Sequence, residues 1–187
     1  MDVGLSSIGL VVLSPFLLLI AAAIKLSDGG RILYRQTRIG LNGRRFMIIK
    51  FRTMNLDAEE HLGAVWAVPN DPRCTRLGLI LRRCGFDELP QLWNIVRGDM
   101  SLVGPRPERP EFARDLRKEY PGYNARHAVR SGLTGFAQIH GWRGYTSIED
   151  RLRHDLFYIQ HWSLILDFKV LALTLIRGWS ERTRNGI

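Results

Sequence analysis

Cysteine is scarce in this sequence, which has only Cys74 and Cys84 among its 187 residues. Two thiols cannot build a disulfide framework or a four-thiolate zinc site, so we expect a reducing compartment. The five histidines show no HxxxH or HxH spacing, and a transition-metal site is not predicted. A GxxxxGK[ST] loop is also absent, which excludes a Walker-type nucleotide site.

Lysine is rare as well, because only four of the 27 basic residues are Lys and the others are Arg. With 18 acidic residues the formal net charge is +9, which favours an anionic partner such as nucleic acid, a membrane surface or a phosphorylated substrate. Residues 1–56 carry eight basic and two acidic side chains, a net of +6. Most of the excess charge therefore lies near the N-terminal end.

Long hydrophobic runs are few, and the strongest one spans residues 3–24 without a charged side chain. This length matches a bilayer core, and the arginines that follow it are typical of the cytoplasmic side of a membrane segment. Ser14 and Pro15 stand at its centre, where proline must kink or break a helix. The segment is either a spanning helix with a kink or a re-entrant helix that enters and leaves by one leaflet. We favour the re-entrant helix.

A second membrane-facing element supports that choice. Residues 148–179 mix apolar and charged side chains at roughly helical spacing and include Trp162 and Trp179, a residue type enriched at membrane interfaces. The alternative is an amphipathic helix that packs only on the rest of the protein. We expect amphipathic interfacial helices with partial membrane contact.

The middle of the chain predicts a mixed domain. Residues 31–53 surround an Asn-Gly pair and resemble a β-hairpin. Helices are expected near residue 55, over 75–84 and over 111–119, whereas the prolines of residues 102–110 exclude a regular helix there. The predicted fold is α/β, mostly helical with a small β-hairpin. We expect a single domain (1–187), with a membrane helix over 1–28 and a cytoplasmic part over 29–187 that would carry any catalytic residues.

The chemistry is expected to centre on Asp87 and Glu88. Adjacent acids are often only a solvated helix start, but here Arg82 precedes the pair and Arg106 follows in a proline-rich loop. Nearby guanidinium groups favour the ionised, nucleophilic form of a carboxylate and can hold phosphate oxygens. Carboxylates are also hard ligands that suit Mg²⁺, so Glu88 and Asp87 are the candidate metal ligands.

Four motifs in order carry a family resemblance: KFRTM (residues 50–54), DELPQL (87–92), GDMSLVGPRP (98–107) and GLTGFAQ (132–138). Together with Ser14-Pro15 and LDFK (166–169), they cover nearly the whole chain. The sequence resembles the catalytic domain of the bacterial monotopic phosphoglycosyl transferases, also called polyprenyl-phosphate sugar-phosphate transferases. In that family the apolar segment is a re-entrant helix broken at Ser-Pro.

The resemblance implies a ping-pong transfer at the cytoplasmic face of the bacterial inner membrane. Asp87 matches the nucleophile, which would attack the β-phosphate of a UDP-sugar, expel UMP and hold a phospho-sugar until undecaprenyl phosphate accepts it. Mg²⁺, held through Glu88, would neutralise phosphate charge. This reaction would be the first membrane step of polysaccharide (exopolysaccharide) or glycoconjugate assembly.

Further site residues follow from the same match. Lys50, Arg82 and Arg106 would stabilise phosphate charge, Arg143 is a weaker candidate for phosphate binding, and Gln91 and Arg52 are expected to support the site. The partners would be a UDP-sugar (UDP-glucose or UDP-galactose favoured), undecaprenyl phosphate and membrane lipids, without nucleic acid; a homodimer is also considered. The N-terminal sequence and the PRPERPEF segment (residues 105–112) resemble a domain taken from a longer relative.

Two rival functions remain. A membrane-anchored basic module could recruit anionic lipid or nucleic acid without catalysis, in which case binding would fall steeply with salt. A membrane-bound glycosyltransferase that passes the sugar alone would release UDP in place of UMP. The released nucleotide therefore separates the two enzymes, and replacement of Asp87 separates an enzyme from a binding module.

Overall fold

The computed structural model describes the chain except for residues 59–64, 67, 69–70, 145 and 185–187. The α-helices are α1 (Asp2–Asp28), α2 (Arg76–Cys84), α3 (Gln91–Val96), α4 (Pro110–Glu119), α5 (Phe136–Ile139), α6 (Ile148–Gln160) and α7 (Leu164–Arg184). The 3-10 turns are η1 (Leu41–Gly43), η2 (Phe86–Glu88) and η3 (Tyr123–His127). The strands are β1 (Leu33–Ile39), β2 (Arg45–Phe51), β3 (Ser101–Val103) and β4 (Gly132–Thr134). The prediction of a mostly helical protein with a small β-hairpin is confirmed.

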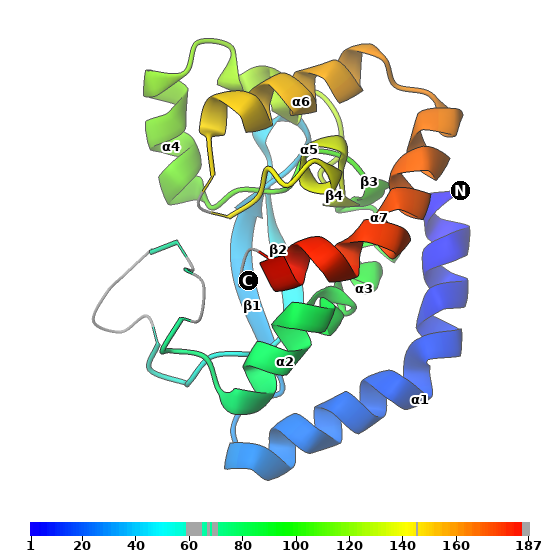
Figure 1. Cartoon of the computed structure of the whole chain (residues 1–187), viewed down its shortest axis with the longest axis vertical. Helices are drawn as coiled ribbons and strands as arrows, with labels where there is room; N and C mark the ends of the chain where they lie inside the picture. Colours follow the sequence, from blue (N-terminus) through cyan, green and yellow to red (C-terminus); the bar gives the residue numbers. More distant parts are fainter. Residues whose placement is uncertain (59–64, 67, 69–70, 145, 185–187) are drawn as a thin grey trace.

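Helix α1 is sharply bent near its middle, where Pro15 stands (Figure 1). Proline has no N–H to donate to the carbonyl four residues earlier, which is that of Val11. The hydroxyl of Ser14 donates to that carbonyl at 2.8 Å and so satisfies the group that Pro15 leaves unpaired. Pro15 therefore bends the helix, and Ser14 supplies a hydrogen bond to the carbonyl that the proline leaves unpaired.

Most apolar side chains of α1 face outward. Val11, Val12, Leu18 and Leu19 each expose about 70% of their surface, and among the described residues α1 is the one helix long and apolar enough to cross a membrane. Ile20 and Ile24 are buried against Phe51 and Leu81, which fixes the second arm of the helix to the rest of the protein. The bend is a finding, whereas the re-entrant course through a membrane remains a prediction.

Local signals predict the hairpin and two helices correctly. Asn42 and Gly43 take positive φ angles of 54° and 73° at the turn, which explains the Asn-Gly pair. The side chain of Thr75 accepts from the backbone of Gly78 at the start of α2, and Pro110 occupies the first turn of α4. The helix expected near residue 55 is not formed over 55–58, where the chain makes a turn; residues 59–64 lie outside the described part.

A second sheet, not predicted, pairs β3 with β4 in parallel. Two glycines beside this pair allow a very close approach of the backbones. A Cβ atom added to Gly132 would lie 2.1 Å from the backbone nitrogen of Gly104, and one added to Gly104 would lie 2.4 Å from the carbonyl oxygen of Arg130. This contact brings the proline-rich loop after β3 next to the glycine-rich segment.

The C-terminal amphipathic stretch forms helices as expected, namely α6 and α7. Ser163 begins the second helix by accepting a hydrogen bond from the backbone of Leu166 at 3.1 Å. Helix α7 buries Val170 but exposes Ile165, Phe168 and Leu175, an apolar face that supports membrane contact. The side chain of Trp179 lies outside the described part of the chain.

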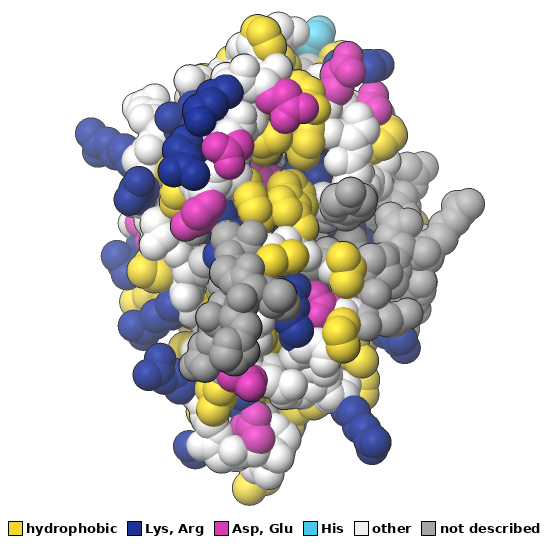
Figure 2. Space-filling view, turned by 90° about the vertical axis from the view of Figure 1, so that its left-hand side faces the viewer, with side chains coloured by type: hydrophobic (Ala, Val, Ile, Leu, Met, Phe, Trp, Pro, Cys, Tyr) yellow, Lys and Arg dark blue, Asp and Glu magenta, His cyan; other side chains and the backbone are white. Residues whose placement is uncertain are grey.

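The elements surround one main hydrophobic core. Ile48, Ile95, Val103, Tyr158 and Val170 are buried there, so the hairpin, α3, β3, α6 and α7 share it. In Figure 1 the hairpin runs through the middle of the molecule, with α6 across its upper end, α4 at the upper left and the second arm of α1 below. Figure 2 looks onto one side of this arrangement, where Lys and Arg side chains gather along one edge of the face.

Candidate active site

The two predicted carboxylates lie on a single tight turn. Helix α2 ends at Cys84, the next residue Gly85 reverses the chain with a φ of 72°, and Asp87 and Glu88 follow in η2. Each of the two residues is 8% exposed. Carboxylates are almost never buried to this degree without partners, so the pair is not the solvated helix start considered as the alternative.

Glu88 is clamped by two cations from distant parts of the chain. Lys50 on β2 donates to Glu88 Oε1 at 2.7 Å, and Arg106 donates from Nη2 to Oε1 at 2.5 Å and from Nη1 to Oε2 at 3.2 Å. The negative charge of Glu88 raises the pKa of Arg106 above its ordinary value. Burial lowers the pKa of Lys50, an effect that Glu88 opposes. The clamp thus places two positive charges beside the neighbouring Asp87.

Arg106 is held in position by contacts with Gln138 and Arg126. Its Nη1 donates to Gln138 Oε1 at 3.1 Å, and its backbone carbonyl accepts from Arg126 Nη2 at 2.9 Å. Arg126 is 2% exposed and pairs with Asp155, with 2.7 Å between Nη2 and Oδ2 and 3.0 Å between Nε and Oδ2. A buried ion pair between η3 and α6 therefore fixes the loop that presents Arg106.

A second buried pair extends this support. Glu108, two residues after Arg106, accepts from Arg151 Nη1 at 2.7 Å and lies 4.0 Å from Arg126 Nη1. Arg151 also donates to the carbonyl of Gly144 at 2.5 Å, and so links α6 to the loop that carries Arg143. The proline-rich loop is anchored at both Arg106 and Glu108.

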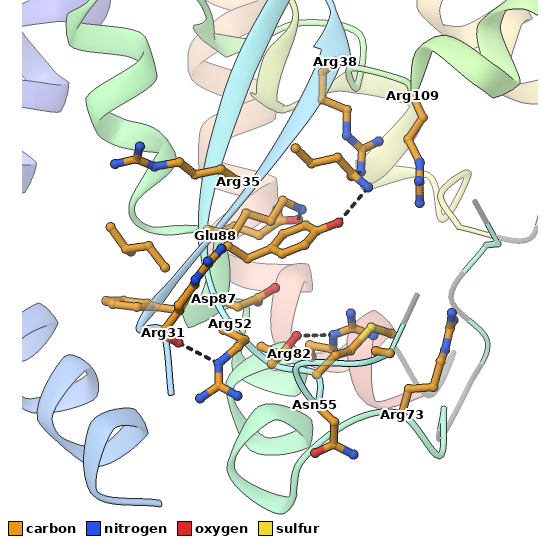
Figure 3. Close-up of a pocket in the computed structure, with 18 of the residues that line it drawn as sticks. Arg31, Arg35, Arg38, Arg52, Asn55, Arg73, Arg82, Asp87, Glu88 and Arg109 are labelled. Carbon is orange, nitrogen blue, oxygen red and sulfur yellow. Dashed lines mark hydrogen bonds and ion pairs between the residues drawn. The ribbon is translucent and has the colours of Figure 1, made fainter. Parts of the chain in front are cut away.

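The carboxylates open into a cavity of about 940 Å³ whose walls are strongly basic (Figure 3). Seven of the predicted residues line it: Lys50, Arg52, Arg82, Asp87, Glu88, Arg106 and Arg143. Arg82 is held by Thr53, whose Oγ1 lies 2.8 Å from Nε. Arg52 pairs with Asp28 at the end of α1, with 2.6 Å between Nη1 and Oδ2. The concentration of cations around two acids suits a ligand with several phosphate groups.

Three predicted residues lie elsewhere. Gln91 is 1% exposed in α3, does not line the cavity, and its Nε2 has no hydrogen-bond partner among the described residues, so it belongs to the interior beneath the site. Ser14 and Pro15 shape α1 and do not line the cavity.

Sequence reasoning missed several cavity and support residues. They come from the hairpin and the residue Arg31 before it, the loop before α2, the proline-rich loop, α4, η3, α5 and α6: Arg31, Tyr34, Arg35, Arg38, Trp66, Arg73, Glu108, Arg109, Phe112, Arg126, Gln138 and Asp155. Arg38 could have been placed on the same face of the hairpin as Lys50, because β1 and β2 pair Tyr34 with Lys50 and Arg38 stands four residues after Tyr34 on β1. Burial lowers the pKa of Arg38 to about 10.

The donor set for a metal ion is small. The described residues contain no group of three or more His, Cys, Asp or Glu side chains that could hold a metal. Both oxygens of Glu88 already accept from cations. The pair Asp87 and Glu88 therefore fits a Mg²⁺ ion that takes one or two protein carboxylates and its remaining ligands from phosphates and water, and does not fit a closed protein cage.

Known proteins match this chain closely. A UDP-glucose:undecaprenyl-phosphate glucose-1-phosphate transferase of Escherichia coli (strain K12) is 42% identical over 97% of this chain and 40% of its own length. A UDP-N-acetylgalactosamine-undecaprenyl-phosphate N-acetylgalactosaminephosphotransferase of Aeromonas hydrophila is 40% identical over 97% of this chain and 44% of its own. The chain thus spans about two fifths of the length of these relatives.

A shorter relative matches along almost its whole length. The exopolysaccharide production protein PSS of Rhizobium leguminosarum bv. phaseoli is 42% identical over 98% of this chain and 94% of its own length. The family model described as bacterial sugar transferase matches residues 1–181. The basic cavity around Asp87 and Glu88 is therefore the candidate active site of a chain that belongs to the bacterial sugar transferase family.

Proposed function

We propose that this protein transfers a sugar-1-phosphate from a UDP-sugar to undecaprenyl phosphate and releases UMP. The observation that carries the proposal is the buried Asp87, next to a Glu88 that Lys50 and Arg106 hold in a strongly basic cavity. Such a site can bind a diphosphate and present a carboxylate to it. The named activities of the two longer relatives support the same reaction.

In the first half-reaction a carboxylate oxygen of Asp87 forms a bond to the β-phosphorus of the UDP-sugar. The bond from that phosphorus to the bridging oxygen breaks, and the electron pair leaves with UMP. In the second half-reaction an oxygen of undecaprenyl phosphate attacks the same phosphorus, which releases the Asp87 carboxylate and forms a lipid diphosphate sugar. The two displacements share one carboxylate.

The cations around Asp87 counter the charge of both half-reactions. A carboxylate that attacks a diphosphate brings like charges together, and fixed positive groups in a buried site lower that barrier. Lys50 and Arg106 are positioned before substrate arrives because Glu88 holds them. Arg82 and Arg143 add charge to the wall, and Arg52 ties it to the end of α1.

We propose Mg²⁺ as the cofactor, held by Asp87 or Glu88 together with substrate phosphates. When bound, the ion supplies charge neutralisation at the diphosphate and the departing UMP.

Removal of divalent metal is expected to abolish UMP release without unfolding the protein. The described residues offer a carboxylate pair and no closed metal cage, so the fold does not depend on the ion. UMP release with EDTA should fall to background and return on addition of Mg²⁺, while circular dichroism stays unchanged. Full activity in EDTA would contradict the metal assignment.

We further propose that α1 is re-entrant at the cytoplasmic face of the inner membrane and that α7 contacts the bilayer surface. The bend at Pro15 and the exposed apolar faces of both helices support this topology. A cysteine introduced at position 2 and the native Cys84 should then react with a thiol reagent from the same side.

Substitution of Pro15 tests the cause of the bend. In a Pro15→Leu variant the backbone N–H is restored and the two arms can form one straight helix, which is long enough to span a bilayer. We expect the cysteine at position 2 to become protected from a cytoplasmic reagent in this variant. The control is Leu13→Ala, which keeps Pro15 and should leave the labelling as it was. Unchanged labelling of Pro15→Leu would contradict a proline-determined re-entrant helix.

The sugar is proposed to be glucose or galactose. The relatives named above act on different UDP-sugars, so a panel of donors must decide. The test is to incubate the protein with each UDP-sugar, undecaprenyl phosphate and Mg²⁺ and to measure UMP and UDP separately. UMP with a lipid-linked product supports the proposed reaction, and UDP would indicate transfer of the sugar alone. If neither nucleotide is released and the protein binds lipid in a salt-sensitive way, the result would favour the binding module.

A further inference from the structure

The cavity reaches the end of the apolar helix α1. Its lining includes Lys25 of α1 and Gly30, Arg31, Ile32 and Leu33, which follow the helix. Figure 3 shows Arg31 on the side of the cavity nearest α1 and Arg109 on the far side, with Asp87 between them in this view. One mouth of the cavity is therefore formed by the residues that directly follow the apolar helix α1.

The chain at this mouth is held in place by Arg52. That side chain pairs with Asp28 through both terminal nitrogens and donates from Nε to the carbonyl of Arg31 at 2.6 Å. The backbone of Gly30 donates to Asp28 Oδ1 at 3.0 Å, and a Cβ atom at Gly30 would lie only 3.0 Å from Arg52 Nη2. Because Arg52 is 8% exposed, the clamp fixes the backbone of Arg31 against a buried group.

The charge of Arg31 is not used in this clamp. The charge of Arg52 is countered by Asp28, whereas the Arg31 side chain makes no ion pair or hydrogen bond with another described residue. The Arg31 side chain is exposed and lines the cavity. Beside it Leu33 is 39% exposed, and Leu26 near the end of α1 is 86% exposed. An exposed cation next to apolar surface suits an amphiphile with an anionic head.

We propose that Arg31 binds the phosphate of the polyprenyl acceptor and that this lipid reaches Asp87 through the mouth beside α1. The inference rests on the proposed function and adds the entry side and a binding residue. The acceptor's hydrocarbon tail must stay in the membrane, so its phosphate has to approach from the side of the membrane helix. The guanidinium of Arg31 can take two phosphate oxygens, and Leu33 offers apolar contact to the first part of the tail.

The test compares Arg31→Ala with Arg44→Ala. Both arginines are exposed, and Arg44 lies beside the hairpin turn and outside the cavity lining, so the two variants lose the same charge at different places. For Arg31→Ala we expect the KM for undecaprenyl phosphate to rise about tenfold, as for loss of one charge-assisted contact. UMP release in a single turnover without acceptor should stay within about twofold of the unchanged protein. Arg44→Ala should change neither quantity.

Three results would overturn the inference. They are an unchanged acceptor KM in Arg31→Ala, an equal rise in Arg44→Ala, and a loss of single-turnover UMP release in Arg31→Ala. The equal rise would assign the effect to general attraction for anionic lipid, which assays in vesicles of neutral lipid and of phosphatidylglycerol would reveal. If the unchanged protein forms product but releases no UMP before acceptor is added, the two-step proposal fails, while the acceptor KM still decides the role of Arg31.

Discussion

Asp87→Asn is expected to abolish UMP release from the UDP-sugar. An amide has the shape of the carboxylate but cannot form the proposed bond to phosphorus, so the first half-reaction should fall by on the order of 10⁴-fold or more. The substitution keeps the size of a side chain that is 8% exposed, and the fold should survive. The measurement is UMP production with Mg²⁺, with and without undecaprenyl phosphate.

A matched control for this variant is Asp115→Asn. Asp115 stands on α4, its side chain is 64% exposed, and it does not line the cavity. That variant should keep the activity of the unchanged protein. Full turnover by Asp87→Asn would remove Asp87 as the nucleophile, and equal losses in both variants would point to a general effect of charge.

Asp155→Asn is expected to destabilise the fold by about 3–5 kcal/mol, the usual effect of leaving one partner of a buried ion pair uncompensated. Asp155 is 2% exposed and lies 2.7 Å from Arg126, which would retain its buried charge. Because Arg126 also donates to the carbonyl of Arg106, the loop should loosen and UMP release should fall as well. The free energy of unfolding can be measured by denaturant titration of the solubilised protein.

Two further variants identify the cause of that loss. Arg126→Met with Asp155→Leu removes both charges, so this double variant should be less destabilised than the sum of its single variants. Asp150→Asn breaks an ion pair with Arg153, which is 70% exposed, and should change stability by less than about 1 kcal/mol. Equal losses in Asp150→Asn and Asp155→Asn would contradict the importance of burial.

The elements that could be predicted from sequence are those with local physical signals. The Asn42-Gly43 pair sets the hairpin turn, Thr75 caps α2, and Pro15 bends α1 at the carbonyl that Ser14 satisfies. Each signal lies within a few residues of the feature it determines. The β3–β4 pair has no such signal, because it depends on Gly104 meeting Gly132, residues that are distant along the chain.

The residues of the candidate site divide in the same way, into those with a local signal in the sequence and those that only the fold brings together. Asp87, Glu88 and the cations near them could be predicted because acids and arginines cluster along the sequence and match family motifs. The buried pairs of Arg126 with Asp155 and of Glu108 with Arg151 could not, since each joins segments that only the fold brings together. The place of Gln91 could not be predicted either, because a position inside a motif does not determine whether its side chain faces the cavity or the interior; its supporting role stays a prediction.

Asp87 is proposed to carry the phospho-sugar between the two substrates. The most direct measurement is mass spectrometry of the protein after incubation with UDP-glucose or UDP-galactose and Mg²⁺ in the absence of lipid acceptor. We expect a hexose-phosphate adduct on the peptide that contains Asp87, which disappears when undecaprenyl phosphate is added. An active protein that never carries the adduct, or carries it on another residue, would contradict the role of Asp87 as the nucleophile.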